Sequence, residues 1–209
     1  STADLKGKTL GVWFYGNEYP FLSWMSRLGL KTDGSANGVT VLRQGWGVEP
    51  LTEGQAACVS TMSYNEYWVV RDAGYSPEQL TVFKYQSEGA ATLEDGLYVH
   101  EKNLSDAAFK DKMVRFVRAS MKGWKYAEAN PKEAAMIILD NDDAGVQTEK
   151  HQVRMMGEIA KLTAGSNGSL DPADYERTVK VLMSGDSDPV ITKKPSGAWT
   201  NEITNAALK

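Results

Sequence analysis

The chain has 209 residues and a formal net charge of −4, with 24% charged and 42% hydrophobic residues. These values are typical of a soluble globular protein with one large domain or two small ones, and the length allows an independent hydrophobic core. The mild charge, with no basic stripe, argues against nucleic acid as a partner, and no apolar run reaches the roughly 18 residues of a membrane span.

The first 85 residues alternate between strand and helix patterns. Apolar, β-prone runs predict strands, whereas apolar residues at helical spacing and glycine stops predict helices. We expect strands at residues 8–14, 38–44, 56–62 and 79–85, and helices at residues 21–30, 48–54 and 64–74. This order favours an α/β fold with a parallel sheet covered by helices.

Beyond residue 85 the composition shifts towards helices. Residues 86–96 are predicted as a loop, and residues 97–102 as one more short strand. Helices are then expected at residues 105–129, 130–141, 148–163, 171–185 and 197–209. The first of these helices carries a stripe of large apolar residues from Phe109 to Trp124, which predicts a packed face.

Polar and aromatic residues follow the third predicted strand, at Tyr64, Asn65 and Glu66. A helix start is a sufficient explanation, because Asn65 suits the cap and Glu66 suits the positive end of the helix dipole. Binding is the alternative, because ligands of open α/β sheets bind beyond the carboxyl ends of the strands. Tyr64 would then stack on a ring, and Glu66 would accept hydrogen bonds from it.

Two other strand exits carry candidate binding residues. Tyr15, Gly16 and Asn17 follow the first strand, where Gly16 would let the backbone approach a ligand, although a plain turn explains the same residues. Trp46 lies between two glycines after the second strand, and it is either packed or facing a ligand. Glu94, further along the chain, could contact a ligand, a hinge or only solvent.

The sequence predicts no metal site and no cofactor. His100 and His151 lie far apart and lack the spacing of metal ligands. Cys58 is the only cysteine, so no intrachain disulfide can form, and we interpret it as a small buried hydrophobic residue.

The segments "DLKGKTLGVW", "LTEGQAACVSTMSYNEYWVVRDAG", "TLEDGLYV" and "RFVRASMKGWKYAEANPKEAA" resemble the substrate-binding proteins of bacterial ABC importers. The most similar branch takes up the pyrimidine precursor of thiamine and, in relatives, riboflavin, whereas more distant relatives serve nitrate, sulfonates and taurine. The resemblance implies a periplasmic binding protein type II-like fold, with two lobes joined by a hinge. It also implies binding roles for the aromatic ring and the acid of the segment at residues 64–66.

In this family "DLKGK" marks the entry to the second lobe, so we expect the first lobe to be incomplete in this chain. Residues 1–86 would form the second lobe, and residues 87–209 would form the return crossing and the C-terminal helices of the first lobe. A separate N-terminal segment or a second copy of the chain could complete that lobe.

The resemblance implies a protein that binds a small aromatic nitrogen heterocycle reversibly and is not an enzyme. Its partners would be this ligand and an ABC permease at the membrane, and it would be periplasmic or exported and attached to the cell surface. A pyrimidine synthase on the same scaffold is the alternative, although the cysteine-rich run of the eukaryotic-type synthases is absent. A truncated fragment without ligand binding is the third possibility.

Overall fold

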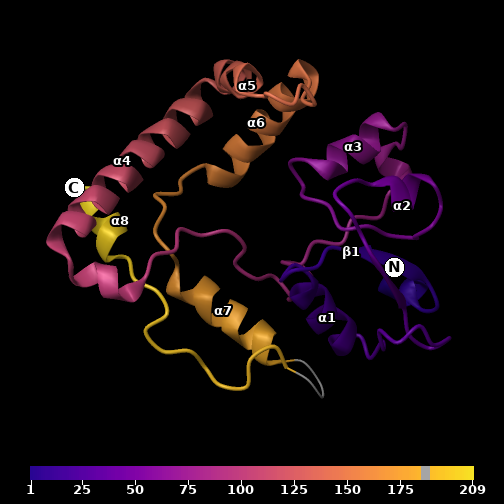
Figure 1. Cartoon of the computed structure of the whole chain (residues 1–209). Helices are drawn as coiled ribbons and strands as arrows, with labels where there is room; N and C mark the ends of the chain where they lie inside the picture. Colours follow the sequence, from indigo (N-terminus) through magenta and orange to yellow (C-terminus); the bar gives the residue numbers. More distant parts are fainter. Residues whose placement is uncertain (185–188) are drawn as a thin grey trace. The chain divides into compact units, whose positions relative to one another are not determined.

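The computed structural model describes residues 1–184 and 189–209 (Figure 1). The described residues form a mixed α/β structure with a small parallel sheet and eight α-helices. They group into two compact units, of which the first contains residues 1–94 and 171–196 and the second contains residues 95–170 and 197–209. The expected assignment of residues 1–86 and 87–209 to two lobes stays a prediction.

The sheet of the first unit contains β1 (Thr9–Val12) and β2 (Thr40–Arg43), which run parallel with Thr9 opposite Thr40 and Val12 opposite Arg43. Both strands lie inside the predicted ranges. The predicted third strand, residues 56–62, lies along the other edge of β1 but forms only one bridge, between Leu10 and Cys58. Backbone hydrogen bonds on either side of that bridge keep this segment parallel to β1.

The strands predicted at residues 79–85 and 97–102 are absent from the described part of the chain. Phe83 and Tyr85 of the first segment instead pack against the core through their rings. Residues 97–99 are exposed, and residues 101–105 form the 3-10 helix η3 (Glu101–Ser105). Both predictions rested on β propensity, which reflects side-chain packing and does not supply the neighbouring strand that a ladder requires.

Helix α1 (Glu18–Arg27) begins and ends three residues before its predicted range and provides three of the eight buried residues of the first unit's core. Its buried residues Phe21, Trp24 and Met25 pack against Leu10 and Val12 of β1. The other elements of this unit are η1 (Thr2–Leu5), α2 (Glu49–Thr52), α3 (Glu66–Asp72), η2 (Pro77–Gln79) and α7 (Pro172–Met183). The predicted end of α7, at residue 185, lies outside the described residues.

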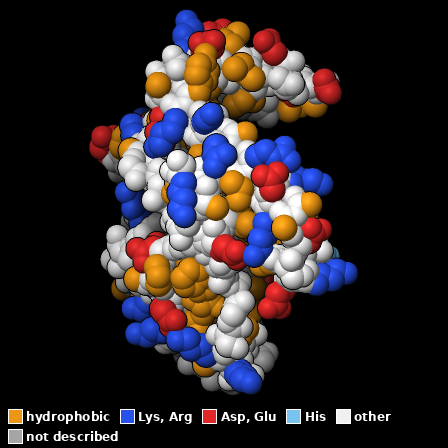
Figure 2. All heavy atoms as spheres, turned by 90° about the vertical axis from the view of Figure 1, so that its left-hand side faces the viewer, with side chains coloured by type: hydrophobic (Ala, Val, Ile, Leu, Met, Phe, Trp, Pro, Cys, Tyr) orange, Lys and Arg blue, Asp and Glu red, His pale blue; other side chains and the backbone are white. Residues whose placement is uncertain are grey.

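The second unit is helical and has a small core. It contains η3, α4 (Ala107–Ala129), α5 (Pro131–Asp140), α6 (Glu149–Thr163) and α8 (Glu202–Ala207). Its fully buried cluster consists of Ala134, Ala135 and Met156. The predicted packed face of α4 is not buried in this chain: none of its residues is buried, and Phe116 is 55% exposed. Hydrophobic side chains accordingly reach the surface seen in Figure 2.

Candidate functional site

The carboxyl ends of β1, β2 and residues 56–60 meet at one edge of the first unit, where the buried side chain of Gln44 joins them. Its Nε2 donates to the carbonyl oxygens of Ser60 (2.9 Å) and Gly47 (3.0 Å), and its Oε1 accepts from Ser60 N–H (2.8 Å). Gly11 of β1 lies between Gln44 and Ser60, and a Cβ at Gly11 would be 3.2 Å from Gln44 Oε1. The glycine therefore lets one side chain bridge the two outer segments across β1.

Tyr15 follows β1 in a conformation that few non-glycine residues adopt. Its φ is 64°, and its side chain is 90% exposed. The guanidinium carbon of Arg43, the last residue of β2, lies 4.7 Å from the centroid of the Tyr15 ring and 5.5 Å from that of Phe14. Backbone strain of this kind concentrates at functional sites, and an exposed ring beside a cation is a surface on which a flat ligand can stack.

The two residues after Tyr15 are held within the turn. Gly16 N–H donates to Glu18 Oε2 (2.7 Å), and Asn17 Nδ2 donates to the carbonyl oxygen of Phe14 (3.2 Å). The Gly16 N–H thus already has an anionic partner, which disfavours a strongly anionic ligand at this helix start. Asn17 occupies the N-cap position of α1 without a capping hydrogen bond from its side chain.

The segment of Tyr64, Asn65 and Glu66 is half-buried at the exit of residues 56–62. The Glu66 carboxylate accepts from Met62 N–H through Oε2 (2.9 Å) and from Asn65 Nδ2 through Oε1 (2.8 Å). Asn65 stands at the N-cap position of α3, but its side chain makes no capping bond, so that part of the helix-start explanation is wrong. Each Glu66 oxygen keeps a second lone-pair site, because an ionised carboxylate offers about four in total.

Trp46 lies in the loop after β2, and its side chain is 95% exposed. The alternative interpretation, that Trp46 is packed inside the protein, therefore does not apply. The neighbouring loop is fixed by the Trp13 indole, whose Nε1 donates to the Gly45 carbonyl oxygen (2.9 Å). This hydrogen bond holds the backbone next to Trp46 in place, although the Trp46 ring is open to solvent.

Glu94 is exposed and lies close enough to Tyr85 to affect its ionisation. Burial of Tyr85 is the main cause that raises the pKa of its hydroxyl to about 12, and the Glu94 carboxylate adds to the rise, whereas a hydrogen bond with the Ser60 side chain lowers it. Ser60 is also bonded to Gln44, so Tyr85 is linked to the edge where the parallel segments end.

The structure thus places seven of the eight predicted residues in one unit in three separate groups after parallel segments, and Glu94 lies outside these groups. The first is the turn after β1, the second is the loop of Trp46, and the third is the segment at residues 64–66. Sequence reasoning missed Arg43, Gln44, Ser60 and Tyr85. The position of Arg43 and Gln44 directly at the end of the second predicted strand was a signal that could have identified them.

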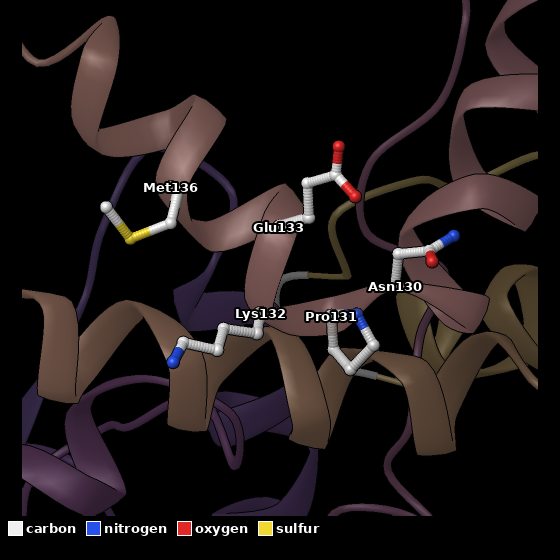
Figure 3. Close-up of a pocket in the computed structure, with 5 residues that line it drawn as sticks. All are labelled: Asn130, Pro131, Lys132, Glu133 and Met136. Atoms are coloured by element: carbon white, nitrogen blue, oxygen red, sulfur yellow. The ribbon is translucent and has the colours of Figure 1, made fainter.

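A hollow of about 500 Å³ lies in the second unit, at the start of α5, and contains none of the predicted site residues. Figure 3 shows that its Lys132 and Glu133 side chains point in opposite directions, so they do not converge on a ligand. Within residues 1–184 and 189–209, no group of three or more His, Cys, Asp and Glu side chains could hold a metal ion. None of the described helices combines the length and the hydropathy needed to cross a bilayer.

Comparison with known proteins identifies the family of this chain. No curated protein matches it. The family model described as NMT1/THI5 like matches residues 1–134, which is more than half of the 209 residues and includes every candidate binding residue described above. The chain therefore belongs to the NMT1/THI5-like family, the family of ABC substrate-binding proteins and of THI5.

Proposed function

We propose that this chain is the solute-binding component of an ABC importer and that it binds a flat aromatic nitrogen heterocycle reversibly. A pyrimidine precursor of thiamine is the first candidate ligand, and a flavin is the second. The observation that carries the proposal is the pair of almost fully exposed rings, Tyr15 and Trp46, at adjacent strand exits of a chain from this family.

Exposed aromatic rings favour a ligand that stacks. Transfer of a large ring out of water is favourable, and a stacked aromatic pair adds about 0.5–1.5 kcal/mol to that gain. Tyr15 stays exposed although its backbone is strained and its ring lies beside the Arg43 cation. A planar heterocycle on these rings would bury the area that the free protein leaves open.

Polar groups after the parallel segments would select among heterocycles. Glu66 is pre-positioned by Met62 N–H and the Asn65 amide, and its remaining lone pairs would accept from an exocyclic amine or a ring N–H. A hydrogen bond to a charged group contributes about 1.5–3 kcal/mol, which is enough to discriminate between ligands of similar shape. Asn17 and Glu94 are further candidates, with Gly16 providing close backbone approach.

Transport would follow from capture between two lobes and closure by hinge motion, which would present a surface to the membrane permease. We propose a periplasmic or exported and surface-attached location for this step. A separate N-terminal segment or a second copy of the chain would complete the first lobe.

Titration calorimetry with an aminopyrimidine tests the ligand assignment. Glu66→Gln is expected to weaken binding about tenfold or more, because an amide offers one acceptor where the carboxylate offers two oxygens. Glu53→Gln is the matched control, since it removes an exposed charge from the same unit, away from the strand exits. Equal affinity of the Glu66 variant and the native protein, with circular dichroism unchanged, would remove Glu66 from the site.

A synthase is the second candidate, because the family contains THI5 as well as substrate-binding proteins. Burial raises the pKa of the single Cys58 thiol, which keeps it protonated and disfavours a thiolate nucleophile at this position. Incubation with candidate substrates, followed by mass spectrometry of the protein and the small molecule, separates the two functions. Turnover or loss of mass from a protein side chain would support the synthase, whereas recovery of both unchanged supports the binding protein.

A further inference from the structure

A second hollow, of about 410 Å³, lies within the first unit between α1 and α7, which run beside each other in Figure 1. Six of its lining residues carry the argument: Ser23, Arg27, Gly89, Arg177, Lys180 and Ser184. Arg27 is the last residue of α1, whereas the first turn of that helix follows the exit of β1. The hollow is therefore separate from the strand exits of the proposed heterocycle site.

Positive charge dominates among the described lining residues of this hollow. Arg27 comes from α1, and Arg177 and Lys180 come from one face of α7, three residues apart. Asp174 pairs with Arg177 (2.5 Å) and offsets one of the three charges. Within the described part of the chain Lys180 has no ion-pair partner, and Glu88, whose carboxylate accepts from the Trp24 indole (3.1 Å), is not among the lining residues.

Both guanidinium groups are fixed by backbone carbonyls. Arg27 Nη1 donates to the Gly89 carbonyl oxygen (2.5 Å), and Arg177 Nε donates to that of Ala91 (3.3 Å). Gly89 has a φ of +67°, and a Cβ there would lie 2.5 Å from Arg27 Nη1, so a side chain at this position would displace the guanidinium from its present place. Each guanidinium has five N–H donors, so several stay available after these bonds.

The floor of the hollow is also polar. The Ser23 and Ser184 hydroxyl oxygens lie 2.9 Å apart, and Ser184 Oγ donates to the Val181 carbonyl oxygen (2.8 Å). Ser23 is itself buried, which fixes the α1 side of the hollow against the end of α7.

We propose that this hollow binds a phosphate group, either as inorganic phosphate or as part of a small phosphomonoester. Two anchored guanidinium groups and the Lys180 ammonium approach from two helices and can address several oxygens of a tetrahedral dianion. Arginine binds phosphate through paired donors of fixed geometry, and lysine adds a mobile point charge. A single carboxylate has only two oxygens and would leave part of this donor set unused.

Calorimetric titration of the native protein with inorganic phosphate, in a buffer without other oxyanions, tests the proposal. We expect saturable binding of one phosphate per chain, weakened roughly fivefold in Lys180→Gln, because an exposed charge contributes about 1 kcal/mol at most. Lys122→Gln is the matched control, since Lys122 is an exposed lysine inside a helix of the other unit. Titration with phenyl phosphate distinguishes the sources: tighter binding than that of inorganic phosphate would identify a phosphomonoester as the ligand.

The proposal is overturned if phosphate shows no saturable binding, or if Lys180→Gln and Lys122→Gln bind it equally. Arg177→Gln is a second test, and its thermal unfolding is measured beside its affinity because Arg177 also holds Ala91. Trp46→Ala should leave phosphate affinity unchanged. The phosphate proposal is therefore tested independently: a negative result for the heterocycle site would not contradict it.

Discussion

Trp46 combines an indole that is 95% exposed with a loop fixed by Trp13, so its ring is presented to solvent by backbone that does not depend on it. Removal of a side chain without packed neighbours changes stability by about 0.5 kcal/mol or less. If the Trp46 side chain is removed, a ligand that stacks on its ring loses both the stacking interaction and the buried apolar area.

We therefore expect Trp46→Ala to lower heterocycle affinity about tenfold while leaving the free energy of unfolding unchanged. Calorimetry and urea unfolding measure the two quantities. Tyr98→Ala, which removes a ring that is 82% exposed in the second unit, should change neither. Equal losses of affinity in both variants would contradict a specific role for Trp46.

Tyr85 gives the protein a stability that depends on alkaline pH. Its pKa is raised from about 10 in the unfolded chain to about 12 in the folded protein, chiefly by burial. The folded state therefore holds this proton more tightly, and the stabilisation is complete below about pH 10 and is lost as the pH rises from 10 to 12.

We expect the free energy of unfolding to fall by roughly 2 kcal/mol over this range because of Tyr85 alone. Tyr85→Phe removes the titrating group and should reduce the slope, although it starts lower by about 1 kcal/mol for the lost Ser60 hydrogen bond. Urea unfolding at pH 9 and pH 11 measures the slope. Identical slopes in the two proteins would show that Tyr85 is not the titrating group.

At the scale of elements, the three parallel segments depend on the absence of a side chain at Gly11. A Cβ there would lie 3.0 Å from Val59 Cγ1 and 3.3 Å from the Cys58 carbonyl oxygen, in addition to its approach to Gln44. The bridge made by Gln44 across β1 would have to shift to accommodate it.

Gly11→Ala is therefore expected to destabilise the protein by about 1–3 kcal/mol, as overpacking usually does. Gly123→Ala, inside α4, where the new methyl group meets nothing within 4 Å beyond its chain neighbours and the backbone of its own helix, should instead stabilise it by about 0.5–1 kcal/mol. Thermal unfolding distinguishes the two. If Gly11→Ala is as stable as Gly123→Ala, the close approach at Gly11 is relieved without cost.

Sequence patterns identified β1, β2 and the eight α-helices of the described residues because these depend on local spacing and local turns. Phe83 and Tyr85 produced a false strand because an alternation of partly buried aromatic residues has the same pattern whether or not a neighbouring strand pairs with it. Residues 64–66 follow residues 56–62, which form one bridge and not the predicted strand, and the Glu66 bond to Met62 depends on how the chain enters α3. Arg43 was missed because a charged residue at a strand end is usually solvated.

At the scale of the whole molecule, the two units differ in how much apolar surface they bury. The first has a core around Leu10, Val12 and Met25, whereas the 23-residue helix α4 of the second has no buried residue. Local stability follows buried apolar contacts, so the second unit should open more readily.

Native-state hydrogen exchange is expected to show faster exchange for amides of α4 than for amides of β1 in the same sample. Mass spectrometry of peptides from both elements measures this directly. Protection of α4 equal to that of β1 would show that its surface is covered in solution.

The openness of Trp46 also has an optical consequence. An indole surrounded by water emits at longer wavelengths than indoles inside a core, so Trp46 forms the red edge of the protein's fluorescence, while the buried Trp24 contributes at the blue side. A guest that covers the Trp46 ring would quench or blue-shift that edge, and a flavin would also absorb part of the emitted light. The protein thus carries its own spectroscopic reporter at the position where we expect its ligand.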